Sequence, residues 1–292
     1  MTMVSNIAET VASSFDFSVD KFPLSGPDGM KTPLYGLFRS DTSELVGRSS
    51  VTSKYVPHNT DDVVTLVEAC SDVFGDSSVQ CHFDNGHYVS VAPTNDRRRS
   101  IFGSSDNIFP RVVIRAGYDG RAFNATIGFY RDLCDNLSML RSVSEMSRSI
   151  RHNGSLRDNM TELVDTFSQL DSSWEKLSQV AAEMEQREVV ISEFLDAVYG
   201  KPNEDSQNSV TRHKNRTEQI VRRLLRENKV SGRTPIGTLA NAKVSGWLAY
   251  NAVQGYVQHD ATRKGNPTDF ARIVAASRDA SVLAAEQFVL SA

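Results

Sequence analysis

The feature of this sequence that most constrains its fold is a regular alternation of apolar residues between positions 156 and 184. Their spacing alternates strictly between four and three residues over four heptads, which places one narrow apolar seam along a helix. Acidic residues such as Asp158, Glu162, Asp165 and Glu175 lie outside the seam. The pattern predicts a long helix that packs either on later helices of the same chain, which we favour, or on a second copy. The seam residues are Leu156, Met160, Leu163, Phe167, Leu170, Trp174, Leu177, Ala181 and Met184.

Pairs of short apolar segments before this helix predict β-hairpins. They flank residues that favour tight turns, most clearly Asn85-Gly86 and Asp119-Gly120, of which the second suits a type I′ turn. Between the first two pairs, residues 60–74 predict a helix with Thr60 as its N-cap. This order predicts an α+β fold, an antiparallel sheet of hairpins with an inserted helix. The paired segments are 34–39 with 44–51, 79–83 with 87–92, and a strand opening at Val112 with one beginning at Arg121.

Further helices are predicted towards the C-terminus. One helix is predicted over residues 189–199 and ends at Gly200. A second, basic helix is predicted over residues 210–228. Helices around Trp247 and over residues 267–290 should complete a bundle against the heptad helix. On the basic helix, the expected buried residues are Ile220, Val221, Leu224 and Leu225. The expected domains are an N-terminal arm (1–30), an α+β sheet domain (31–152), a long helical region (153–199), a linker (200–209) and a C-terminal helical bundle (210–292).

The third hairpin presents arginines beside aromatic residues. Strand alternation puts Arg121 on the same face as Phe123 and Phe129. Such a sheet either stacks bases and grips phosphates, or is half-buried with its arginines in solvent or paired with acidic residues. The preceding segment, residues 94–110, is either a mobile loop or an electrostatic clamp. The candidate nucleic-acid-binding residues are Arg97, Arg98, Arg99, Arg111, Arg115, Tyr118, Arg121, Phe123, Arg131, Arg222 and Arg223.

Charge is distributed unevenly along the chain. The formal net charge of -4 argues against a uniformly basic DNA-coating protein. Residues 90–160, however, contain eleven arginines and seven acidic residues, and residues 209–233 contain eight basic and two acidic residues. Local basic stripes are what a phosphate backbone needs, because each neutralised phosphate releases a counterion. The alternative for a basic run on a helix is a solvated face.

Six segments, in order along nearly the whole chain, carry a family resemblance. The segments are LYGLFRSDTSELVG (34–47), SKYVPHN (53–59), RAGYDGRAF (115–123), IGFYRDLCDNLSM (127–139), SIRHNG (149–154) and WLAYNAVQGYVQHDATRKG (247–265). Together they resemble the phage/plasmid-like protein family, domain-of-unknown-function family 932, which is carried by bacteriophages, plasmids and integrated elements. The resemblance implies a mobile-element protein acting in bacterial cytoplasm, but no established activity or functional residues. The order of elements is also analogous to that of strand-annealing recombinases of the Rad-fifty-two type.

The sequence carries few signatures of catalysis, metal binding or membrane insertion. The chain has no GxxxxGK[ST], GxSxG or HExxH motif, so we expect neither an enzyme nor a cofactor. Cys81, His82 and His87 invite a zinc site, but Cys81 and His82 are neighbours on a strand and so point to opposite faces. We assign His259-Asp260 and Asn251 to helix packing. Because the chain lacks an apolar run of about 18 residues and a signal peptide, we expect a cytoplasmic protein without a membrane partner.

The leading hypothesis is a non-catalytic, homo-oligomeric protein that binds single-stranded DNA, with annealing as a further activity, in replication or recombination of a mobile element. The alternative is an interaction protein that uses the heptad helix and the acidic N-terminal half to bind a host factor, for example in counter-defence. Burial of the hairpin guanidinium groups in ion pairs would favour this alternative.

Overall fold

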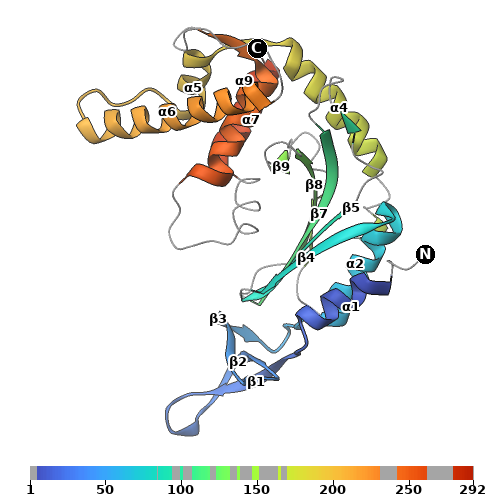
Figure 1. Ribbon diagram of the computed structural model, residues 1–292. Coiled ribbons are helices and arrows are strands. Elements are labelled where there is room, and N and C mark those ends of the chain that lie inside the picture. Colours follow the sequence, from blue (N-terminus) through green and yellow to red (C-terminus); the bar gives the residue numbers. More distant parts are fainter. Residues whose placement is uncertain are drawn as a thin grey trace. The chain divides into compact units, whose positions relative to one another are not determined.

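The computed structural model combines helices with antiparallel sheets, as the predicted α+β class requires (Figure 1). It describes residues 5–83, 85–93, 99–100, 107–118, 123–131, 137–138, 147–150, 164–165, 170–230, 242–261 and 279–291. The chain divides into two compact units. Unit 1 comprises residues 1–97, 110–128 and 145–171, and unit 2 comprises residues 98–109, 129–144 and 172–292.

The strands form three sheets. One has the order β1-β2-β3; a seven-stranded sheet has the order β10-β8-β7-β5-β4, with β6 paired to β7 and β9 to β8; the third is β11-β12. The predicted hairpins 34–39 with 44–51 and 79–83 with 87–92 are confirmed. The strands are β1 (Val19–Ser25), β2 (Lys31–Arg39), β3 (Leu45–Thr52), β4 (Ser77–Phe83), β5 (Gly86–Pro93), β6 (Arg99–Ser100), β7 (Asn107–Gly117), β8 (Phe123–Arg131), β9 (Leu137–Ser138), β10 (Ser147–Ile150), β11 (Glu188–Val190) and β12 (Lys243–Ser245).

Helix α2 (Thr60–Phe74) of unit 1 is the inserted helix that the sequence predicts. Its N-cap is Asn59 rather than Thr60, because the Asn59 side chain accepts a hydrogen bond from the backbone of Asp62 while the Asp62 carboxylate accepts one from the Asn59 backbone. The Thr60 hydroxyl instead donates to the Phe15 carbonyl oxygen at 2.8 Å. This bond links the start of α2 to the chain that follows α1.

The N-terminal segment is folded and is not the extended arm that the sequence suggested. Helix α1 (Ser5–Ser14) packs on α2 and β4, and Val11 and Phe15 are almost completely buried. β1 then pairs with β2 from Val19 onward. Together with Tyr118, these strands form a core cluster that includes Val19 and Leu37. Val11, Phe15 and Val19, all from the predicted arm, therefore contribute to the core of unit 1.

Unit 2 is mainly helical. α5 packs on α9, and α7 packs on both α6 and α9. Every residue of α7 is buried. A Cβ atom on Gly246 would lie 2.2 Å from Cγ1 of Val289 and 2.9 Å from the carbonyl oxygen of Met184, so this position has no room for a side chain. The helices are α4 (Leu170–Gln186), α5 (Ile191–Tyr199), α6 (Gln207–Val230), α7 (Gly246–Gly255), the π-helical turn η4 (Tyr256–Asp260) and α9 (Ala280–Ser291).

The heptad seam is confirmed where the structure describes it, over α4. Trp174, Leu177, Ala181 and Met184 are 9%, 0%, 0% and 0% exposed, and Trp174 contacts Phe129 of β8 with ring centroids 5.6 Å apart. The seam residues before 170 lie outside the described residues, and the side chain of Leu170 is not described either. On α4, the seam packs within the chain and is not exposed to a partner.

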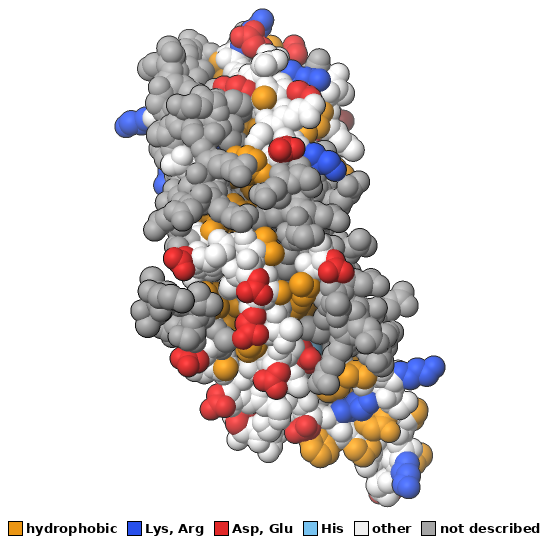
Figure 2. All heavy atoms as spheres, turned by 90° about the vertical axis from the view of Figure 1, so that its right-hand side faces the viewer, with side chains coloured by type: hydrophobic (Ala, Val, Ile, Leu, Met, Phe, Trp, Pro, Cys, Tyr) orange, Lys and Arg blue, Asp and Glu red, His pale blue; other side chains and the backbone are white. Residues whose placement is uncertain are grey.

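Two surface features distinguish unit 1. Most of the charged side chains visible in the lower half of Figure 2 are acidic. Helices α1 and α2 and their ends expose Glu9, Asp16, Asp61, Glu68, Asp72 and Asp76. The sheet β1-β2-β3 also exposes large apolar side chains, including Phe22 and Leu45. Within the part of the chain that the structure describes, no helix combines the length and apolarity needed to cross a bilayer.

Candidate anion-binding site

The hairpin aromatic residues proposed to stack bases are buried. The Tyr118 ring stacks on that of His58 at 4.3 Å, and its hydroxyl donates a hydrogen bond to the His58 carbonyl oxygen at 2.9 Å. Burial raises the pKa of Tyr118, so the hydroxyl keeps its proton. Phe123 contacts the His58 ring edge-on at 5.7 Å. Both side chains are 0% exposed, so neither can stack on a base in this fold and that prediction is wrong.

Two of the hairpin arginines are buried as well. Arg115 is 7% exposed, and its Nε donates a hydrogen bond to the Tyr88 hydroxyl at 3.1 Å. The Nη1 atom of Arg131 lies 2.7 Å from Oε2 of Glu227, and each of these side chains is 2% exposed. Buried charges need such partners, because their desolvation is costly. These two guanidinium groups serve the core and do not face a polyanion.

The other candidate arginines of the sheet and its loop do not form an exposed basic surface among the described residues. Arg97, Arg98 and Arg121 lie outside the described residues, as does the predicted turn at Asp119-Gly120. Arg99 belongs to β6, a short strand within the segment expected to be a loop, and its side chain is not described. Arg111 on β7 is half-buried.

Helix α6 carries exposed cations, among them Arg212, Arg222 and Arg226. Residues at positions 212, 216, 219, 223 and 226 recur at four- and three-residue spacings and so share one helix face; four are arginines and the fifth is Gln219. We call this set the arginine stripe. At 1.5 Å rise per residue it runs for roughly 21 Å. The buried face carries Ile220 and Leu224 as predicted, but Leu225 is 36% exposed.

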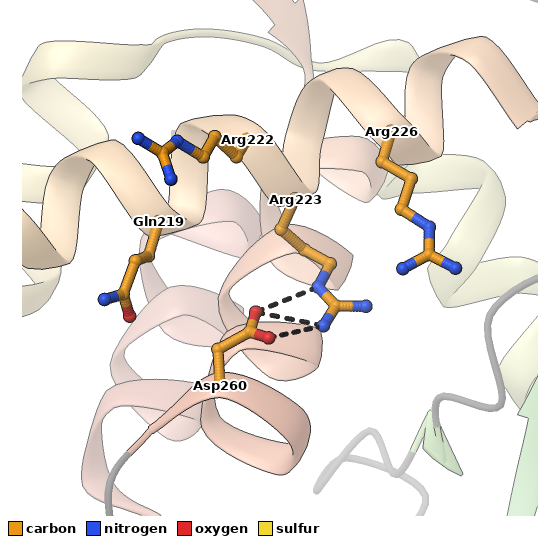
Figure 3. A pocket seen from close by; sticks show the side chains of 5 residues that line it. All are labelled: Gln219, Arg222, Arg223, Arg226 and Asp260. Atoms are coloured by element: carbon orange, nitrogen blue, oxygen red, sulfur yellow. Dashed lines mark hydrogen bonds and ion pairs between the residues drawn. The ribbon is translucent and has the colours of Figure 1, made fainter.

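A pocket opens along the stripe, between α6 and η4 (Figure 3). It has a volume of about 400 Å³ and is lined by Gln219, Arg222, Arg223, Arg226 and Asp260. We call it the arginine pocket. Three guanidinium groups and one carboxylate give it a formal charge of plus two, so it attracts anions.

The three arginines of the pocket differ in their partners. Arg223 is 9% exposed and is held by Asp260, whose Oδ2 accepts a hydrogen bond from Nε at 3.1 Å and whose Oδ1 accepts one from Nη2 at 2.8 Å. Arg222 and Arg226 are exposed, and no described carboxylate pairs with either one. Guanidinium groups bind phosphate oxygens through two parallel hydrogen bonds. Arg222 and Arg226 are therefore the groups available to an incoming anion.

Most of this chain matches a known protein family. The model of the domain of unknown function DUF932 matches residues 48–283. The chain belongs to the DUF932 family. No curated protein and no solved structure gives a significant match. The family description names no activity, so the chemistry of this DUF932 protein has to be argued from its own residues.

The sequence identified part of the arginine pocket. It named Arg222 and Arg223 as contacts and counted Arg226 only among the basic residues of this helix, and it missed Gln219 and the role of Asp260. The four-three spacing of the stripe was a usable signal for Arg226, because the same rule identified the heptad seam. Asp260 was assigned to helix packing with Asn251. That assignment fits Asn251, which is fully buried and donates from Nδ2 to the Trp247 carbonyl oxygen at 2.7 Å.

A second polar cluster of the DUF932 protein lies in the core of unit 1. Nε2 of His58 and Nδ1 of His87 are 2.8 Å apart, and both rings are 0% exposed. Burial, and then the charge of Arg39, lowers the pKa of His87 to about 3. Both rings are closed off from solvent, so we assign the pair to the core. Among the described residues, no three His, Cys, Asp or Glu side chains are placed to hold a metal ion.

Proposed function

We propose that this DUF932 protein is a non-catalytic nucleic-acid-binding protein, with single-stranded DNA as its ligand, that serves replication or recombination of a phage or another mobile element in the bacterial cytoplasm. The observation that carries the proposal is the arginine pocket with its stripe on α6. Since Tyr118 and Phe123 are buried, the proposed contacts go to backbone phosphates and not to bases. Such contacts are independent of base sequence.

The concave shape of the pocket favours a single strand over a duplex. A volume of about 400 Å³ can receive a phosphate with its sugar. A flexible strand can bend a phosphate into such a recess, whereas a duplex is stiff and keeps its phosphates on a convex surface. The exposed arginines of the stripe, Arg212 and Arg226, lie roughly 21 Å apart along the helix and would contact further phosphates of the same strand. Several copies on one strand, a homo-oligomeric arrangement, would extend the site and could support annealing.

The test is binding of a labelled thymidine oligonucleotide to the full chain over a salt series. Affinity of the wild type should fall steeply with salt, because phosphate contacts release counterions. The double variant Arg222→Gln/Arg226→Gln should bind more weakly, with a log–log salt slope smaller by about 1.4, since about 0.7 is expected for each lost contact to a single strand. The matched control is Lys201→Gln/Lys214→Gln, which removes the same charge from exposed positions off the stripe. Equal losses in the two double variants would remove the pocket from the proposal.

A second candidate function is binding of a partner protein, for example a host factor in counter-defence. The observation that favours it is the outer face of β1-β2-β3, where Phe22 is 54% and Leu45 is 56% exposed. Phe22 contacts Phe38 edge-on at 5.9 Å on this face. A Cβ atom on Gly36 would lie 2.7 Å from Cε2 of Phe38, so the missing side chain makes room for the ring. Exposed apolar patches of this kind are typical of interaction surfaces.

The two candidates are separated by variants of the two surfaces. If the protein acts by binding a partner, Phe22→Ser/Leu45→Ser should lose capture of that protein from a bacterial lysate. The arginine double variant should keep it. The wild type would then show no salt-dependent affinity for the oligonucleotide, which would exclude the first proposal.

A further inference from the structure

Asp260 occupies the position on Arg223 that a phosphate group would take. Its carboxylate oxygens accept hydrogen bonds from Nε and Nη2 of Arg223 at 2.8 to 3.1 Å. This two-pronged geometry is the one by which a guanidinium group binds a phosphate. Figure 3 shows Asp260 below the middle of α6, with Arg223 directed at it. Arg223 is thus already supplied with an anion from its own chain.

The position of Asp260 is set by the π-helical turn. η4 follows α7 directly and ends at Asp260, where the backbone N–H of Ala261 donates to the Tyr256 carbonyl oxygen at 2.8 Å. π-helical turns occur mostly as single-turn insertions in helices and are frequent at functional sites. The turn packs on α6 and presents the Asp260 carboxylate to Arg223. The carboxylate is 33% exposed, so water and anions can reach it.

We infer that Asp260 is a built-in counterion of the arginine pocket, which competes with phosphate for Arg223 and thereby limits the affinity of the pocket for polyanions. This inference rests on the proposed function and deepens it. The released counterions are those held by the strand, one for each phosphate that a cation neutralises. While Asp260 holds Arg223, this arginine neutralises no phosphate, so the salt dependence of the wild type comes from exposed cations such as Arg222 and Arg226.

The test is the variant Asp260→Asn in the full chain, measured with the same thymidine oligonucleotide and salt series. Asparagine keeps the size of the side chain and one acceptor oxygen but removes the charge. We expect about fivefold tighter binding at low salt, from the loss of one nearby repulsive charge. We also expect a log–log salt slope steeper by about 0.7, because Arg223 becomes one more contact that neutralises a phosphate and releases a counterion from the strand. The matched control is Glu218→Gln, which removes one exposed negative charge from α6 outside the pocket lining.

The outcomes separate the inference from the function on which it rests. If the wild type binds and Asp260→Asn differs from it no more than Glu218→Gln does, Asp260 is not a competing counterion and the proposed function stands. Weaker binding by Asp260→Asn with a lowered melting temperature would make the ion pair a structural tie and would also overturn the inference. If neither the wild type nor Asp260→Asn binds the oligonucleotide, both proposals fail. Binding by the variant alone would support a counterion strong enough to block the pocket.

Discussion

The ion pair between Arg131 and Glu227 joins β8 to α6 in an environment almost without water. Each side chain is 2% exposed, and the guanidinium carbon lies 5.9 Å from the centre of a Trp247 ring. Removal of one partner leaves the other charge buried and uncompensated. We therefore expect Glu227→Gln to lower the free energy of unfolding by about 3–5 kcal/mol in urea titrations. Glu218→Gln on the same helix is exposed and should change it by at most about 0.5 kcal/mol. Equal effects would show that the pair contributes little to stability.

His87 makes the protein sensitive to acid. Its pKa in the folded state, about 3, lies below the ordinary value of 6.5, because the ring is buried and Arg39 is near. As the pH falls, the unfolded chain therefore takes up a proton before the folded chain does. The resulting stability is complete above about pH 6.5 and is lost between pH 6.5 and pH 3, by about 1.4 kcal/mol per pH unit.

The effect of His87 can be measured by urea unfolding at pH 7 and pH 5. From this group alone, the wild type should lose about 2 kcal/mol over that interval. His87→Gln has no ring to protonate, so its loss of unfolding free energy between pH 7 and pH 5 should be smaller than that of the wild type by about 2 kcal/mol. This difference should hold even though the variant is less stable than the wild type at pH 7. Identical pH losses in the two proteins would mean that His87 takes up its proton in the folded state without cost.

At the scale of elements, the spacing of apolar residues predicted the helices and strands that bury one apolar face. Helix α2 and the strands of the second hairpin follow from residue spacing alone, and all are present. The α4 seam is present over its described turns. These patterns survive because a helix or strand must bury its apolar face, whatever it packs against. Register and partners need tertiary contacts, which spacing does not contain.

Features that depend on distant contacts were not predictable from spacing. Residues 5–14 have few strong apolar positions, yet α1 is held by Val11 and by the bond from Thr60 to Phe15. Arg131 was predicted to contact nucleic acid, but it is buried against Glu227, which lies 96 residues away in the sequence. For the candidate site, the sequence predicted α6 and its arginines. It did not predict the pocket, because Asp260 reaches the pocket from another helix.

At the scale of the whole molecule, the DUF932 match and the folded units have different boundaries. The match begins at residue 48 and ends at residue 283. Unit 1 takes Val11, Phe15, Val19 and Leu37 into its core, all at most 5% exposed and all before the match. Unit 2 likewise takes in Val289, which is 0% exposed and lies after the match. Both cores thus depend on residues outside the region that defines the family.

We therefore expect residues 48–283, produced alone, not to form a stable copy of either unit. The truncation cuts β3 and α9, removes α1, β1 and β2, and leaves the apolar partners of the missing side chains in water. Its amide proton spectrum should be poorly dispersed and its urea transition broad, whereas the full chain should unfold cooperatively. A truncated chain with a sharp transition at the full-length midpoint would contradict this expectation, since the N-terminal strands and the last turns of α9 would then be additions to a core that is complete without them.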